Sequence, residues 1–136
     1  MLMRLVSFLI IINTRTWLDR RYISKIAVYY TLCLIIFSLI PVPDLGISRF
    51  QLFEIDKLAH FIMYFSLTIL WSFASKNLYN STFKLLLFAI FFGFVLEIFQ
   101  HILPFGRYFD LGDLVANSLG VIFGIFILYC IKKKLL

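Results

Sequence analysis

The sequence predicts an all-α, polytopic membrane protein: a four-transmembrane-helix bundle with its N and C termini in the cytoplasm. Of the 136 residues, 62% are apolar and only 15% are charged, and a soluble domain of this size cannot bury that much apolar surface. Charged residues and prolines also divide the chain into four apolar segments, each close to the roughly 20 residues that a helix needs to cross a bilayer. A water-soluble domain and a disordered chain are therefore both excluded.

Each predicted span is bounded by charges or prolines. The first runs over Tyr22–Ile40 and ends at a Pro-Val-Pro sequence, which cannot continue a helix. The second lies between Lys57 and Lys76. The third follows Lys84 and ends one residue before a proline, and the fourth, Leu114–Ile131, stops at three consecutive lysines. Such a lysine cluster is typical of the cytoplasmic end of a span.

The chain divides into an N-terminal segment, residues 1–21, and a four-helix transmembrane domain, residues 22–136. The apolar run from Met1 to Ile12 is too short to cross a bilayer, and no small-residue cleavage site follows it, as a signal peptide would require. We expect an interfacial or weakly ordered segment. A re-entrant or partly inserted helix is the alternative.

Basic residues are concentrated on one side of the predicted membrane. Of the 13 lysines and arginines, only Arg49, Lys57 and Arg107 fall on the side opposite the termini. Because cytoplasmic loops carry an excess of lysine and arginine, both termini are expected in the cytoplasm. The net charge of +6 is explained by these topology signals, so no nucleic-acid partner is expected.

Polar residues within the second, third and fourth spans lie at one height. At 1.5 Å per residue, they are about 18 to 24 Å above the cytoplasmic lysines, in the outer third of the membrane. Side chains three, four or seven positions apart share one face of a helix. The resulting stripes are Asp56, His60 and Tyr64; Gly93, Glu97 and Gln100; and Asp110, Asp113, Asn117, Gly120 and Gly124.

Each stripe has a purely structural interpretation as well as a functional one. Gly120 and Gly124 form a Gly-xxx-Gly pair, which indicates close helix packing. Asp110 and Asp113 fit the start of a helix as well as a binding site, because acidic groups there offset the helix dipole. Glu97 is too deep for easy solvation, which favours a functional or at least paired role. The simplest arrangement is an outward-facing polar pocket above glycine contacts, with Gly93 among the packing residues.

Together these residues resemble the VanZ-like family of small bacterial integral membrane proteins. The resemblance covers Pro41 to Ile131, while the first forty residues carry no family motif beyond one apolar span. It implies a multi-pass protein of the bacterial cytoplasmic (inner) membrane with a link to envelope precursors or lipids, since the founding member is known for raising resistance to teicoplanin. The motifs are Asp56-Lys57-x-x-His60-x-x-x-Tyr64, Glu97-x-x-Gln100 and Arg107-x-x-Asp110-x-x-Asp113-x-x-x-Asn117-x-x-Gly120-x-x-x-Gly124.

The first functional hypothesis is recognition of a lipid-linked or cell-wall precursor headgroup in the cell envelope. The guanidinium group of Arg107 can donate two parallel hydrogen bonds to a phosphate or a carboxylate. Carboxylate, amide and phenol groups can bind a sugar or a peptide. Membrane lipids are expected partners, and the oligomeric state is left open. The predicted ligand-binding residues are Asp56, Lys57, His60, Tyr64, Glu97, Gln100, Arg107, Asp110, Asp113 and Asn117.

Two other classes of function remain open. One is an intramembrane acid-base or metal-dependent enzyme acting on an envelope lipid, with Glu97 or His60 as general base. The other is a structural or partner-dependent membrane subunit. We expect no cofactor and no bound metal. The weak candidates for a divalent metal are Asp56, His60, Glu97 and Asp113.

Overall fold

A computed structural model describes residues 17–40, 49–75, 81–104 and 108–135. In that part of the chain the protein forms four helices and no strand: α2 (Trp17–Leu39), α3 (Arg49–Ala74), α5 (Thr82–Ile102) and α6 (Leu111–Leu135). All four contain an apolar stretch long enough to cross a membrane: Arg20–Leu39, Ile55–Ala74, Thr82–Ile102 and Leu111–Ile131. The prediction of an all-α, four-span membrane protein is confirmed.

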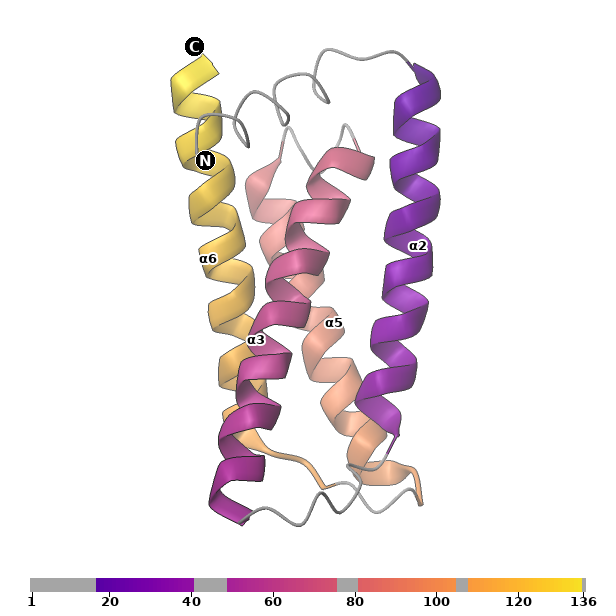
Figure 1. The fold of residues 1–136 in the computed structure, drawn as a ribbon, viewed down its shortest axis with the longest axis vertical. Coiled ribbons are helices and arrows are strands. Elements are labelled where there is room, and N and C mark those ends of the chain that lie inside the picture. The colour runs from indigo at the N-terminus through magenta and orange to yellow at the C-terminus, as the bar shows by residue number, and fades with distance from the viewer. Residues whose placement is uncertain (1–16, 41–48, 76–80, 105–107, 136) are drawn as a thin grey trace.

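The four helices alternate in direction along the bundle (Figure 1). The start of α2, the end of α3, the start of α5 and the end of α6 lie at one end, at the top of the figure. We call this the basic end, and the opposite end the polar end. The helices α3 and α6 pack against each other most extensively, while α2 packs against α3 and α5.

The helices extend beyond the apolar stretches that predicted them. The first begins at Trp17, ahead of the predicted start at Tyr22, and α3 begins at Arg49, ahead of the predicted boundary at Lys57. Charged residues near a span's end are tolerated inside a helix, because long side chains reach the headgroup layer while the backbone keeps its hydrogen bonds. Lys57 is consequently a residue within α3, and its charge lies beside α6.

Glycines of α6 explain why α3 and α6 approach so closely. A Cβ atom at Gly120 would collide with the carbonyl oxygen of Phe61 and lie 3.0 Å from the backbone nitrogen of Phe65. At Gly124 it would lie 3.1 Å from Cβ of Thr68. Small residues that let backbones approach are the usual contact of helices in membranes, where apolar side chains gain little by leaving lipid.

Hydrogen bonds attach α2 to the rest of the bundle. The indole nitrogen of Trp71 donates to Oγ1 of Thr31 at 3.0 Å, and the hydroxyl of Tyr30 donates to the carbonyl oxygen of Met63 at 3.1 Å. At the polar end, Nε2 of Gln100 donates to the carbonyl oxygen of Ser38 at 2.7 Å. In hydrocarbon such bonds hold helices together without a contribution from the hydrophobic effect.

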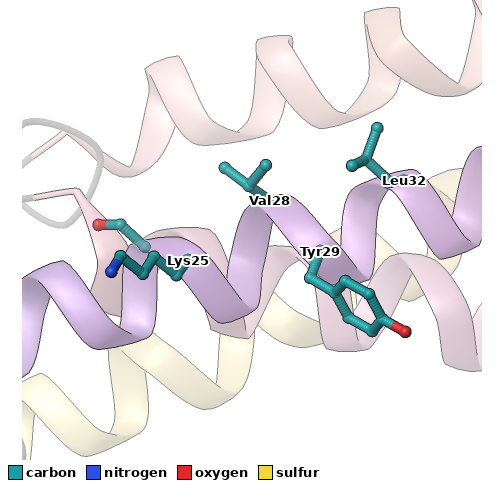
Figure 2. A pocket seen from close by; sticks show the side chains of 5 residues that line it. Lys25, Val28, Tyr29 and Leu32 are labelled. Atoms are coloured by element: carbon teal, nitrogen blue, oxygen red, sulfur yellow. The ribbon is translucent and has the colours of Figure 1, made fainter.

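An open groove runs along the outer surface of α2 (Figure 2). It lies in the N-terminal half of that helix, toward the basic end. The groove is therefore separate from the polar residues at the opposite end of the bundle, described below. Its lining residues all come from α2: Ser24, Lys25, Val28, Tyr29 and Leu32.

Candidate functional site

An ion pair between α3 and α6 is at the centre of the polar end. Nζ of Lys57 lies 2.7 Å from Oδ2 of Asp110 and 3.1 Å from Oδ1 of Asp113. Lys57 and Asp110 are partly exposed, whereas Asp113 is buried. A Cβ atom at Gly112 would collide with the end of the Lys57 side chain, so glycine at this position makes room for the lysine between its two carboxylates.

Asp110 also begins helix α6. Its Oδ1 accepts a hydrogen bond from the backbone nitrogen of Gly112 at 2.6 Å, and its carbonyl oxygen accepts from the nitrogens of Asp113 and Leu114. These are the contacts of an N-cap residue. Asp113, in the first turn of the helix, is favoured there by the helix dipole. The structural and the functional interpretations of this acidic pair are therefore compatible, because Asp110 caps the helix with one oxygen and binds Lys57 with the other.

His60 is buried between α3 and α6. Its Nδ1 lies 3.0 Å from Oδ1 of Asn117, which is also buried. An amide oxygen can only accept a hydrogen bond, so Nδ1 carries the proton. The other ring nitrogen, Nε2, lies 3.8 Å from Oδ1 of Asp56 and 3.8 Å from Oδ2 of Asp113. The ring is thus held at one nitrogen and faces two carboxylates with the other.

Glu97 brings α5 into the same cluster. Its side chain is buried, and its Oε2 accepts a hydrogen bond from the backbone nitrogen of Asp110 at 3.4 Å. Tyr64 is fully buried nearby, against Gly93, where an added Cβ would lie 3.1 Å from the tyrosine ring. Its hydroxyl makes no hydrogen bond within the described part of the chain. Gly93 also faces Asn117, so α3, α5 and α6 meet at this level.

The structure therefore brings together most of the predicted site residues, in what we call the polar cluster. Gln100 is buried but bonds to α2, as described above, which makes it a link between helices. Arg107 lies outside the described residues. Gly112 was not among the predicted site residues. Its position between two acidic residues at a helix start, Asp110-Leu111-Gly112-Asp113, is the signal that could have identified it. The polar cluster consists of Asp56, Lys57, His60, Glu97, Asp110, Asp113 and Asn117.

One group of donor atoms in the polar cluster is compact. One atom each of Asp56, His60 and Asp113 lies within 4.8 Å of the other two. These are three of the four residues named from the sequence as weak metal candidates. Glu97, the fourth, is not a member of this group.

The ion pair of Asp110 predicts a specific loss of stability in acid. Burial raises the pKa of this carboxyl, but the hydrogen bond from Lys57, the bond from the Gly112 backbone and the lysine's charge lower it, and the net pKa is below its ordinary value. An unfolded aspartate titrates near about pH 3.9. A depressed folded pKa stabilises the fold fully above that pH, and this contribution disappears as the pH falls through the folded pKa.

Wild type and Asp110→Asn should accordingly differ in melting temperature by a constant amount between about pH 5 and 7, and by less below about pH 4. Other carboxylates titrate in both proteins and cancel in the comparison. Melting curves of the two purified proteins across this range measure the difference. An undiminished difference at the acid end would show that the carboxylate's charge is not what stabilises the fold.

Four apolar helices long enough to cross a membrane, with buried ionisable side chains gathered at one end of the bundle, define a class, the small polytopic membrane proteins. The sequence model of the VanZ/LLP1 family matches residues 2–132. The chain belongs to this family, and the resemblance drawn from the motifs is confirmed. The match also covers residues 2–40, which carry none of the motifs. Comparison with curated proteins and with solved structures gives no match.

Proposed function

We propose that this protein binds the polar headgroup of an envelope lipid or a lipid-linked cell-wall precursor at the polar cluster. The observation that carries the proposal is the burial of Glu97, His60 and Asp113 within the length of the apolar spans. Ionisable side chains within membrane-spanning segments are costly and rare, and they usually mark a site of function.

The position of the polar cluster suits a ligand that is anchored in the bilayer. It lies at the C-terminal end of α5 and at the starts of α3 and α6, where a helix that crosses the bilayer approaches the headgroup layer. Lys57 and Asp110 keep part of their side chains exposed. A lysine ammonium attracts phosphate as a point charge, and carboxylate and amide groups bind hydroxyls and peptide groups. A lipid-linked headgroup reaches such a site by lateral diffusion.

We further propose that the polar end faces outward from the bacterial cytoplasmic membrane. The excess of lysine and arginine around the basic end supports this orientation. A cysteine placed at Lys84, which is exposed at the basic end, should react with a membrane-impermeant thiol reagent only after the membrane is opened. If that cysteine is labelled in intact cells, the basic end faces outward and the polar cluster lies on the cytoplasmic side, which would contradict the proposed orientation.

Native mass spectrometry of the protein, gently extracted from its own membrane, tests the proposed ligand. The wild type should carry a lipid-linked species enriched over bulk phospholipid. Glu97→Gln keeps the shape and the acceptor for the Asp110 nitrogen but removes a charge. Hydrogen bonds to charged groups contribute about 1.5 to 3 kcal/mol, so occupancy at limiting ligand should fall by about 10- to 100-fold.

Lys84→Gln is the matched control, because it also removes one charge but lies on an exposed part of α5 at the basic end. It should leave the bound species unchanged. A wild type that carries only bulk phospholipid, in the proportions of the membrane, would refute headgroup recognition. The proposed link to the family's glycopeptide phenotype is measured separately, as the teicoplanin susceptibility of cells with and without the protein, and with Glu97→Gln.

A further inference from the structure

We propose that Asp56, His60 and Asp113 form a binding site for a divalent cation of the first transition row. The inference does not depend on the proposed headgroup function, since a cation can bind whether or not a lipid does. It rests on three features of the described residues: the spacing of the donor atoms, the tautomer of the histidine and the contacts that orient the ligands.

The spacing of the donor atoms fits a shared cation. Nε2 of His60 lies 3.8 Å from an oxygen of Asp56 and from an oxygen of Asp113, which is too long for a hydrogen bond. Metal–donor distances are about 2.0 to 2.5 Å, so two ligands of one ion lie about 3 to 4 Å apart. All three donor atoms lie within 4.8 Å of one another, as ligands on one side of a single ion do.

The tautomer of His60 presents a lone pair to this group. Because Nδ1 donates its hydrogen to the amide oxygen of Asn117, a neutral ring carries its lone pair on Nε2. That nitrogen is aimed between two carboxylates in a residue that is only 2% exposed. A cation placed between these three atoms would be held by one imidazole nitrogen and two carboxylate oxygens.

The surrounding contacts resemble those that orient metal ligands. A histidine that binds a metal usually donates its other N–H to an oxygen acceptor, which fixes the orientation of the ring. Here the side-chain oxygen of Asn117 is that acceptor. Asp113 directs Oδ1 toward Lys57 and Oδ2 toward His60, so the lysine orients the carboxylate without occupying the second oxygen. Asp56 and His60 are four residues apart on one face of α3, the same i, i+4 spacing by which helices present paired metal ligands.

The donor set also indicates the class of ion. One imidazole with two carboxylates suits zinc, manganese or iron(II), since imidazole favours the later transition metals and carboxylates accept harder ions. Three protein ligands leave coordination positions for water or a ligand oxygen, as in metal sites that take part in binding or chemistry.

The test uses the full-length purified protein in lipid nanodiscs, with Mn²⁺ as an electron paramagnetic resonance probe and Zn²⁺ as its competitor. The wild type should bind one equivalent of Mn²⁺, released by Zn²⁺, and pulsed spectra should show coupling to one imidazole nitrogen. His60→Gln should abolish that coupling. Asn117→Leu, which releases the ring, should weaken Mn²⁺ binding by about 10- to 100-fold, the usual effect of losing an outer-shell partner.

His101→Gln is the matched control, because this second histidine lies exposed on α5. It should leave both the affinity and the nitrogen coupling unchanged. Asp56→Asn, at a less buried ligand, is the second test variant if His60→Gln does not fold, and it should weaken binding while retaining the nitrogen coupling. Wild-type protein that binds no stoichiometric Mn²⁺ or Zn²⁺, or bound Mn²⁺ without an imidazole nitrogen, would overturn the proposal. So would binding that survives unchanged in His60→Gln.

Discussion

Replacing Gly120 by alanine should destabilise the protein strongly. The new Cβ atom would meet backbone atoms of Phe61 and Phe65, which cannot rotate away as a side chain can, so α3 and α6 must separate. Overpacking typically costs about 1 to 3 kcal/mol, and we expect the upper part of that range. The measurement is thermal unfolding of the purified protein in detergent, compared with the wild type.

Gly124→Ala is the comparison within the same helix. Its added methyl group would meet mainly the Thr68 side chain, at 3.1 Å, and the carbonyl oxygen of Phe65, at 3.3 Å. Small shifts can relieve these contacts, so the loss of stability should be smaller than at Gly120. At an exposed position inside a helix, replacing glycine by alanine raises the stability by about 1 kcal/mol. If Gly120→Ala instead raised the melting temperature, the close contact of α3 and α6 would be wrong.

Replacing Lys57 by methionine should produce the second large effect. The change keeps much of the side-chain length but leaves Asp110 and Asp113 without the ammonium that lies between them. Breaking a buried pair costs about 3 to 5 kcal/mol. Asp110 is 37% exposed, and water screens its charge, so we expect a loss nearer about 2 kcal/mol in the free energy of unfolding.

A double-mutant cycle separates the ion pair from other effects of the lysine. In the Lys57→Met background, Asp113→Asn removes the buried charge that the lysine had balanced, so the double variant should recover part of the lost stability. The coupling energy between the two positions should reach about 1 to 3 kcal/mol. Lys84→Met, at an exposed position of α5, is the matched control. Simple additivity of the two changes would mean that the ion pair does not stabilise the fold.

The positions of the helices were largely predictable, while their boundaries were less so. Apolar length located all four spans, because crossing a bilayer imposes the same requirement on each helix. The starts of α2 and α3 lie earlier than predicted. Composition identifies the part of a helix that sits in hydrocarbon, but the helix itself continues as long as its backbone hydrogen bonds are favourable.

The helix faces that carry the candidate site were predictable from the sequence. Periodicity placed His60, Asn117 and Glu97 on polar stripes of three different helices, and the structure joins these stripes near one level. Gln100 belongs to the stripe of Glu97, yet it bonds to Ser38 of α2. Gly112 lies between two predicted residues and was missed, because its role is to leave space for a side chain from another helix.

Apolar length and the 3.6-residue period were enough to predict the fold class and the residues that share a helix face, and the family followed from the resemblance of the motifs. Which faces meet could be seen only in the packed bundle. Gly120 of α6 lies against the Phe61 backbone of α3, and in the same packing Asp113 lies beside both Lys57 and His60. No local pattern encodes this arrangement, because it results from the packing of side chains far apart in the chain.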